Sequence, residues 1–166
     1  MEKLWSPWRS KYIESFNSEM SDDGCIFCEA AKQDTENPKS LVIHKAKLTY
    51  TLLNLYPYNN GHLMVVPFRH ISEFTELTEE EGTETFKQLQ LAQNALSEIS
   101  KPQGFNIGAN LGRTGGAGID EHIHFHIVPR WNGDTNFMPV LGEVKVISQE
   151  LMDTKLRLLN AYKKLL

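Results

Sequence analysis

Three histidines alternate with large apolar residues near the middle of the second half of this chain. His122, His124 and His126 are separated by Ile123 and Phe125, which matches the two-residue side-chain period of a β-strand. On a strand all three imidazoles project from one face, whereas on a helix they would spread around the cylinder. Aligned imidazoles can coordinate a metal or carry out nucleophilic chemistry. Metal coordination is the simpler interpretation of three aligned histidines, so a nucleophilic role needs further support.

A glycine-rich stretch directly precedes the histidines and favours phosphate chemistry. Four glycines lie between Asn110 and Gly118. Glycine lets backbone N–H groups turn inward and approach an anion closely. We therefore predict a cradle for a phosphate group beside the histidine face.

The chain has two cysteines, Cys25 and Cys28, three positions apart. A disulfide across so short a loop would constrain little, so metal binding or redox chemistry is the better interpretation. The spacing is that of one metal-ligand pair, and further ligands would have to come from distant parts of the chain.

Short segments rich in β-branched and aromatic residues predict the strands that position these groups. A strong turn at 56–61 and a glycine-rich connection separate several of them, which together indicate an antiparallel sheet. The predicted strands are residues 41–43, 48–53, 62–66, 105–111 and 122–128, with a weaker one at 140–147, where Gly142 interrupts the apolar run.

Two helices and an N-terminal arm complete the prediction. Thr78 followed by Glu81 is a capping-box signature, and apolar residues then recur at helical spacing until Pro102. Those apolar residues are Phe86, Leu89, Ala92, Leu96 and Ile99. Residues 148–166 are amphipathic and predict a C-terminal helix that docks on the body or on a partner. Residues 1–24 predict an extended arm anchored by its indoles.

Length and composition predict a single α/β or α+β domain spanning residues 1–166. The chain has 166 residues, of which 40% are hydrophobic, enough for one core. Its net charge is −4, and lysines and arginines are scattered, which argues against nucleic acid as a partner. It contains neither a signal peptide nor an apolar run of membrane-spanning length, so we expect a cytoplasmic protein without a membrane partner.

The histidine segment resembles the signature of the histidine-triad (HIT) family, His-x-His-x-His-x-x with apolar residues at x, which residues 122–128 fill without departure. Around it, residues 116–119 and 129–131 are similar to a bacterial branch related to diadenosine tetraphosphate phosphorylases and hydrolases. The resemblance implies a half-barrel antiparallel sheet and a homodimer. It also implies an enzyme that attacks the α-phosphate of a dinucleoside polyphosphate through a covalent nucleotidyl-histidine.

By this resemblance the three histidines are the catalytic residues, with His124 as the nucleophile. A neutral imidazole attacks only if its other nitrogen carries the proton, so we expect a neighbouring carbonyl oxygen to fix that tautomer. His126 would donate a hydrogen bond to the phosphate or the leaving group, and His122 is the first residue of the triad.

The resemblance also implies a set of substrate-binding residues around the phosphates. Asn110, Gly116, Ala117 and Gly118 would stabilise charge on the phosphoryl oxygens, the last two through their backbone amides. Many relatives carry a hydroxyl residue where this chain has Ile119. The hydroxyl contact with phosphate is therefore missing here.

Three more residues are predicted to contact the substrate or support the site. Asn54 matches the family position that grips the ribose hydroxyls, with a turn asparagine as the alternative. His62 resembles a family histidine packed behind the triad, with a core histidine as the alternative. Trp131 is expected to border the pocket and cover a nucleobase, with a place in the core or in a dimer seam as the alternative.

A structural zinc site is implied by a wider resemblance to galactose-1-phosphate uridylyltransferases and zinc-containing triad proteins. In those proteins two cysteines, a histidine and the first triad histidine hold the metal. The corresponding residues here are Cys25, Cys28, His70 and His122. Such a site would pin the N-terminal arm to the catalytic strand without doing chemistry itself. The alternative is a pair of buried reduced thiols with His70 exposed.

Other functions remain open at this stage. The chain could be a nucleoside phosphoramidase or an adenylyl-compound hydrolase, a metal-dependent hydrolase with three histidine ligands, or a non-catalytic nucleotide or zinc sensor. A complete triad favours an enzyme over a sensor, because sensing does not require histidine at position 124. Water and inorganic phosphate are both possible acceptors in the second half-reaction.

Overall fold

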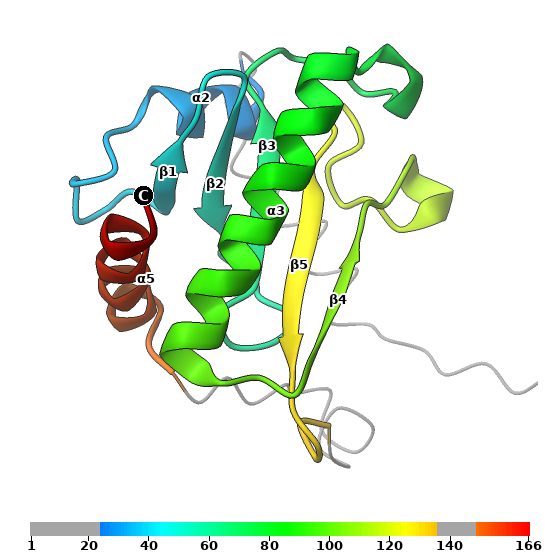
Figure 1. Cartoon of the computed structure of the whole chain (residues 1–166). Coiled ribbons are helices and arrows are strands. Elements are labelled where there is room, and N and C mark those ends of the chain that lie inside the picture. The colour runs from blue at the N-terminus through cyan, green and yellow to red at the C-terminus, as the bar shows by residue number, and fades with distance from the viewer. Residues whose placement is uncertain (1–23, 136–148) are drawn as a thin grey trace, which may run out of the picture.

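A computed structural model of the protein describes residues 24–135 and 149–166. Within these ranges five strands form one antiparallel sheet in the order β1-β2-β3-β5-β4 (Figure 1). The strands are β1 (Val42–Lys45), β2 (Thr49–Leu53), β3 (Leu63–Pro67), β4 (Gly104–Gly108) and β5 (Phe125–Arg130). The predicted arm, apart from its last residue, and the predicted strand at 140–147 lie outside the described residues. None of the helices in the described ranges has the length and apolar character needed to cross a membrane.

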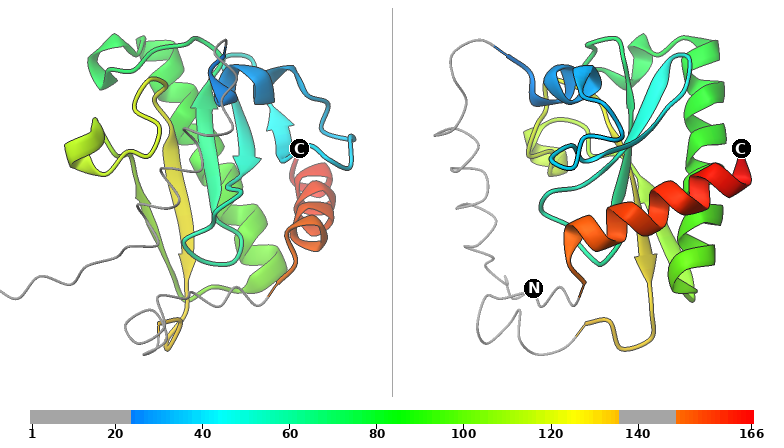
Figure 2. Two further views of the ribbon diagram at one scale, coloured as in Figure 1. Left: turned by 180° about the vertical axis from the view of Figure 1, so that it is seen from behind. Right: turned by 90° about the vertical axis from the view of Figure 1, so that its left-hand side faces the viewer.

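Three helices pack around the sheet. They are α2 (Ile26–Lys32), α3 (Glu79–Ser100) and α5 (Leu151–Leu165), and the short 3-10 turns are η1 (Phe74–Glu76) and η2 (Arg113–Gly115). Helix α3 crosses one face of the sheet, whereas α2 lies on the opposite side together with the loop between β4 and β5 (Figure 2). The fold is thus the predicted α+β arrangement, with the sheet covered on both sides.

Helix α3 begins with the capping box that the sequence predicts. The Thr78 hydroxyl accepts a hydrogen bond from the Glu81 amide at 3.2 Å, and the Glu81 carboxylate accepts one from the Thr78 amide at 2.9 Å. Phe86, predicted to belong to the apolar face, is 71% exposed. The buried stripe passes through Thr85 and Leu89 instead, and successive helical residues point about 100° apart.

The buried residues separate into two clusters, one on each face of the sheet. Along β3, Leu63 and Val65 point towards α3, while Met64 and Val66 point towards α2, as the two-residue period requires. In the pairing of β3 with β5, Met64 lies opposite His126. Because directly opposed residues share a face of the sheet, His126 lies on the α2 side.

Strand β5 starts later than predicted, at Phe125 rather than at residue 122. Its pairing with β3 stops where Val65 lies opposite Phe125. Further along β3 comes Pro67, which has no N–H to extend the ladder. The chain before β5 bonds elsewhere, since the amide of Ile123 donates to the Ile71 carbonyl at 2.7 Å.

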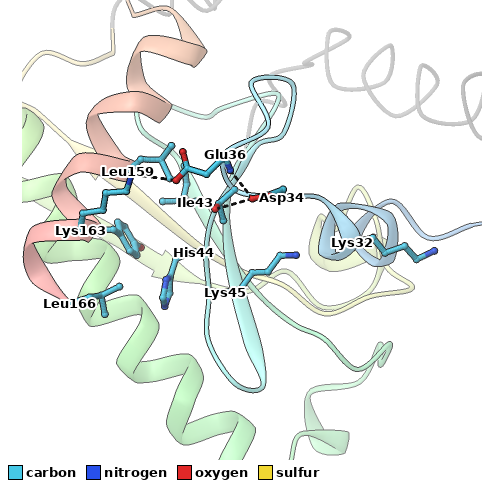
Figure 3. Close-up of a pocket in the computed structure, with 11 residues that line it drawn as sticks. Lys32, Asp34, Glu36, Ile43, His44, Lys45, Leu159, Lys163 and Leu166 are labelled. Atoms are coloured by element: carbon cyan, nitrogen blue, oxygen red, sulfur yellow. Dashed lines mark hydrogen bonds and ion pairs between the residues drawn. The ribbon is translucent and has the colours of Figure 1, made fainter.

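The predicted C-terminal helix is α5, and it docks on the body of the domain. Leu158 and Tyr162 are buried in the cluster that α3 covers, and Lys155 donates to the Asn37 carbonyl at 2.7 Å. Beside its last turn, α5, β1 and the loop after α2 line a hollow of about 500 Å³ (Figure 3). The ion pair between Glu36 and Lys163 lies in this hollow. None of the predicted site residues lines it.

Candidate active site and metal centre

The tautomer of His124 is set by the backbone next to it. Its Nδ1 lies 2.9 Å from the carbonyl oxygen of His122. A carbonyl oxygen only accepts, so Nδ1 carries the proton and Nε2 keeps its lone pair. The side chain is 6% exposed, and this burial lowers the pKa of His124, which keeps the imidazole neutral at pH 7. The arrangement is the one that sequence reasoning expected of a nucleophile, with His122 supplying the carbonyl.

A chain of hydrogen bonds behind His126 sets its tautomer as well. The amide of Tyr58 donates to His62 Nδ1 at 3.1 Å, so the proton of His62 is on Nε2. That Nε2–H donates to His126 Nδ1 at 2.9 Å, which places the proton of neutral His126 on its own Nε2. His126 Nε2 is buried without a hydrogen-bond partner among the described residues. It is therefore a donor that is oriented by the protein and not used by any of the described residues.

Burial and charge keep His126 neutral. Burial, together with the neighbouring His124, lowers the pKa of His126 to about 4. The two rings are 4.8 Å apart between centroids and nearly perpendicular. At neutral pH the site thus presents one imidazole with a free lone pair and a second one with a free N–H.

Two aromatic residues that the sequence analysis did not select enclose these imidazoles. The Phe27 ring lies 4.7 Å from the His124 ring, and the Tyr58 ring lies 4.6 Å from His62 and 5.6 Å from His126. Phe27 lies between the two cysteines in the sequence. Because the cysteines were predicted to lie close to His122, the position of Phe27 beside the triad could have been predicted too. Tyr58 gave no such signal, because a turn residue is expected to face solvent.

The four predicted metal ligands converge at one place. The thiol sulfurs of Cys25 and Cys28 lie 3.3 Å and 3.7 Å from His122 Nδ1, and Cys28 Sγ lies 3.3 Å from His70 Nδ1. All four ligand atoms lie within 4.8 Å of one another. A tetrahedron with metal bonds of about 2.0–2.3 Å has edges of about 3.3–3.8 Å, which is the range of these three distances, so the cluster could hold a metal ion.

The orientation of His122 also suits a metal ligand. Its Nε2 lies 2.9 Å from the Pro67 carbonyl and therefore carries the proton, which leaves the lone pair on Nδ1, the atom that faces the thiols. Both ring nitrogens of His122 thus face other groups of the protein. A direct part of this ring in the chemistry stays a prediction, and the contacts favour a positioning role.

The alternative of a metal held by all three triad histidines does not fit this geometry. His122 Nδ1 faces the thiols, His124 Nδ1 donates to a carbonyl, and His126 Nδ1 accepts from His62. Among the described residues the only group of ligands that could hold a metal is the cysteine and histidine cluster.

Asn54 is buried beside His62, and its side chain is already engaged. Its Oδ1 accepts from the amide of Tyr56 at 3.0 Å, which is the turn contact that sequence reasoning gave as the alternative. Its Nδ2 lies 3.3 Å from His62 Nδ1. An amide oxygen has a second lone pair and an amide nitrogen a second proton, so contact with a ribose diol remains a prediction.

The glycine-rich loop closes on itself more than predicted. The Gly112 carbonyl accepts from the amides of Gly115 at 3.1 Å and of Ala117 at 3.2 Å, while Asn110 Nδ2 donates to the Gly116 carbonyl at 3.4 Å. In this conformation the Ala117 amide is therefore occupied by the Gly112 carbonyl, five residues back, in a bond that closes the loop around the 3-10 turn. Contact of Asn110, Gly116, Ala117 and Gly118 with phosphate stays a prediction.

Trp131 lies at the far end of β5 from His126. Its indole N–H donates to the carbonyl of Ser100, the last residue of α3, at 3.3 Å. Within one chain Trp131 packs against the end of the long helix, because β5 continues to Arg130 and so places Trp131 away from the triad. These contacts favour the alternative, a place in packing, and a place at the substrate pocket stays a prediction.

Comparisons with known proteins assign the family. The model of the HIT domain family matches residues 34–133. A protein of Mycobacterium tuberculosis described as AP-4-A phosphorylase is 43% identical over 160 residues, which cover 93% of this chain and 81% of that protein. The bis(5'-adenosyl)-triphosphatase of Saccharomyces cerevisiae is 35% identical over 91 residues, 54% of this chain and 44% of that protein. This chain belongs to the HIT family.

A solved structure agrees with this fold. A Zn-bound histidine triad family protein from Mycobacterium smegmatis superposes with a TM-score of 0.68 at 24% identity, covering 86% of this chain and 95% of that one. At this level of identity the likeness concerns the fold. The antiparallel sheet with its helices, as predicted for the family, is therefore confirmed.

Proposed function

We propose that this protein is an enzyme that cleaves dinucleoside polyphosphates, such as diadenosine tetraphosphate, through a nucleotidyl group carried on His124. The observation that carries the proposal is the pair of fixed tautomers. The lone pair of His124 is on Nε2, and the buried Nε2–H of His126 is a donor without a partner among the described residues. A nucleophile beside a donor is what nucleotidyl transfer requires.

The first half-reaction makes and breaks one bond each. His124 Nε2 attacks the α-phosphorus and forms a P–N bond while the bond to the bridging oxygen breaks. The nucleoside polyphosphate leaves as an anion, and the His126 Nε2–H stabilises it by a hydrogen bond. As the P–N bond forms, the His124 ring becomes positively charged, and the His122 carbonyl at 2.9 Å from Nδ1 stabilises that charge.

The second half-reaction releases the nucleotide. Water or inorganic phosphate attacks the phosphorus from the side opened by the leaving group, the P–N bond breaks, and His124 returns to its neutral tautomer. Water yields a nucleoside monophosphate and phosphate yields a nucleoside diphosphate. The names of the relatives from Mycobacterium tuberculosis and Saccharomyces cerevisiae support this substrate class and include both outcomes.

The substrate contacts that we propose follow the predicted set. Asn54 takes the ribose, while Asn110 and the loop that contains Gly116, Ala117 and Gly118 lie along the phosphates. The loop already changes its backbone direction at Gly116, where φ is 95°, a value that favours glycine. A small rearrangement there would release the Ala117 amide towards an anion.

We also propose that Cys25, Cys28, His70 and His122 hold one structural zinc ion. The edge lengths of the ligand cluster and the free lone pair on His122 Nδ1 support it, as does the existence of a Zn-bound relative in Mycobacterium smegmatis. With four protein ligands such a site is closed, so its metal would stabilise the fold and leave the reaction to the histidines.

A homodimer is the assembly that we propose. Among the described residues β4 pairs on one edge with β5, which leaves its other edge for a second chain. Two large apolar side chains on or just after β4, Ile107 and Leu111, are 51% and 48% exposed. Light scattering that gave the mass of one chain at micromolar concentration would refute the dimer.

Product analysis with diadenosine tetraphosphate tests the proposed function. ADP and ATP in the presence of inorganic phosphate indicate phosphorolysis, whereas AMP and ATP indicate hydrolysis. If neither pair forms while a nucleoside phosphoramidate or another adenylyl compound is cleaved, the substrate class is the alternative one. Binding of AMP without cleavage of any of these compounds would favour the remaining hypothesis, a non-catalytic nucleotide sensor.

A further inference from the structure

We propose that the turn carrying Cys25 and Cys28 positions the nucleophile, because metal ligation and the Phe27 ring together hold His124 in its attacking orientation. The metal would then affect catalysis through the placement of His124, in addition to stabilising the fold. This inference rests on the proposed roles of His124 and of the metal ligands.

The first connection passes through His122, which belongs to both sites. Its Nδ1 faces Cys25 Sγ at 3.3 Å, and its Nε2–H donates to the Pro67 carbonyl at 2.9 Å. Its backbone carbonyl accepts from His124 Nδ1 at 2.9 Å. A metal bound at Nδ1 therefore fixes the residue whose carbonyl determines which nitrogen of His124 has the lone pair.

The second connection is the Phe27 ring. It is 2% exposed and lies 4.7 Å from the His124 ring and 5.6 Å from the His122 ring. Phe27 is held from behind, since the Tyr50 hydroxyl donates to its carbonyl at 2.6 Å. The ring thus fills one side of the space around His124 and prevents the imidazole from turning about its side-chain bonds.

The metal ligands fix the position of Phe27 in turn. Helix α2 has seven residues, and the N-cap residue Cys25 that precedes it makes no capping hydrogen bond with its side chain. So short a helix is not stable without tertiary contacts. Cys25 and Cys28 lie on either side of Phe27, so ligation of both thiols would fix the backbone that carries the ring.

The consequence is specific to the chemical step. Without the metal, the fold keeps the strands and α3, but His124 loses both constraints and exchanges between tautomers and rotamers. Misplacing a catalytic group by about 1 Å can cost roughly a hundredfold in rate. We expect kcat to fall about tenfold to a hundredfold and KM to change much less, because Asn54 and the glycine-rich loop are not part of the metal cluster.

The experiment compares full-length wild type with Cys28→Ser, Phe27→Leu and Phe27→Ala. Lys32→Ala is the matched control, because Lys32 lies on the same helix and its ion pair with Glu29 is exposed. Zinc content is measured by elemental analysis, and kcat and KM with diadenosine tetraphosphate. The state of His124 is read from its ring ¹⁵N chemical shifts and from the signal of the Nδ1 proton. This last reading does not depend on turnover.

The expected results differ between variants. Cys28→Ser loses zinc and Phe27→Ala keeps it, yet both show averaged ¹⁵N shifts at His124 and a reduced kcat. Phe27→Leu retains part of the activity, since leucine fills part of the space, and it remains informative if Phe27→Ala does not fold. Lys32→Ala matches wild type in every measurement. Zinc removed from wild type by a chelator gives the same averaged shifts, and added zinc reverses them.

Unchanged His124 shifts and unchanged kcat in zinc-free, folded Cys28→Ser, with only a lower melting temperature, would overturn the inference and leave a purely structural metal. Failure of the proposed function would look different. In that case His124→Ala would retain turnover. This outcome does not depend on whether the ¹⁵N chemical shifts of His124 change when zinc is removed from the wild type.

Discussion

Replacing His62 with leucine tests the hydrogen-bond chain that orients His126. His62 is fully buried, accepts from the Tyr58 amide and donates to His126 Nδ1. Leucine has a similar size and no polar atom, so two buried polar groups, Asn54 Nδ2 and His126 Nδ1, lose this partner. The Tyr58 N–H, which is only partly buried, loses it as well. Each of the two buried groups costs about 1–3 kcal/mol, and the added apolar burial offsets about 1–2 kcal/mol of the total. The free energy of unfolding should therefore fall by about 2–3 kcal/mol, the middle of the range that these figures give.

The same substitution should reduce the rate. With no donor at Nδ1, the neutral His126 ring is free to carry its proton on either nitrogen, and Nε2–H is no longer the fixed donor. Removal of one transition-state donor costs about a hundredfold or more in kcat, so partial loss of its orientation should cost about tenfold to a hundredfold. KM should change little.

Urea unfolding at pH 7, followed by circular dichroism, gives the stability, and initial rates of diadenosine tetraphosphate cleavage give kcat. Tyr58→Phe is the control, since it keeps both the backbone N–H and the ring beside His62. Its stability should stay within about 0.5 kcal/mol of wild type. A His62→Leu protein with wild-type stability and wild-type kcat would refute the argument for a fixed donor at His126.

Three further tests concern the metal cluster, a partly buried ion pair and the indole. Protein purified without added metal should contain one zinc per chain. If reduced, folded and active protein contained no zinc, the metal site would be refuted and the cysteines would be packing residues. Arg69 holds the pKa of Glu81 at about 2, so this pair should stabilise the fold by about 1–2 kcal/mol above pH 4.5. Because the folded pKa is the lower one, the advantage of wild type over Glu81→Gln should shrink as the pH falls from 4.5 towards 2; an advantage independent of pH in urea titrations would contradict this. Trp131→Ala should lower the melting temperature and weaken binding of AMP and of the dinucleotide equally; selective loss of dinucleotide binding in calorimetry would put the indole back at the site.

Much of the architecture could be predicted because it depends on local patterns. The alternation of His122 to His126 with apolar residues placed three imidazoles near one another, and Thr78 with Glu81 marked the start of the long helix where α3 begins. The cluster of Cys25 with His70 and His122 was predicted from the family resemblance, and the ligand atoms do converge.

The remaining features depend on contacts that are distant in sequence. Strand β5 begins late because Pro67, far along the chain, ends the pairing. The glycine-rich loop was expected to open towards an anion, but glycine also permits the tight turn that uses its own amides, and composition does not distinguish the two. The position of Trp131 likewise depends on where β5 ends against α3.

The orientation of the imidazoles is a further property that residue types do not encode. The carbonyls of His122 and Pro67 and the amide of Tyr58 determine which nitrogen of each ring carries a proton. Every residue has such groups, so the sequence gives no sign of which of them meet a ring. The chemistry of the site follows from these backbone contacts as much as from the histidines.

The most direct test of the central claim is to trap the nucleotidyl-histidine. Wild-type protein is mixed with diadenosine tetraphosphate, quenched within milliseconds at alkaline pH, where phosphohistidine bonds survive, and digested for mass spectrometry. We expect an added adenylyl group on the peptide that contains His124, localised to that residue by fragmentation and absent from His124→Asn. Rapid turnover with no adduct on any histidine at any quench time, or full turnover by His124→Asn, would contradict the claim.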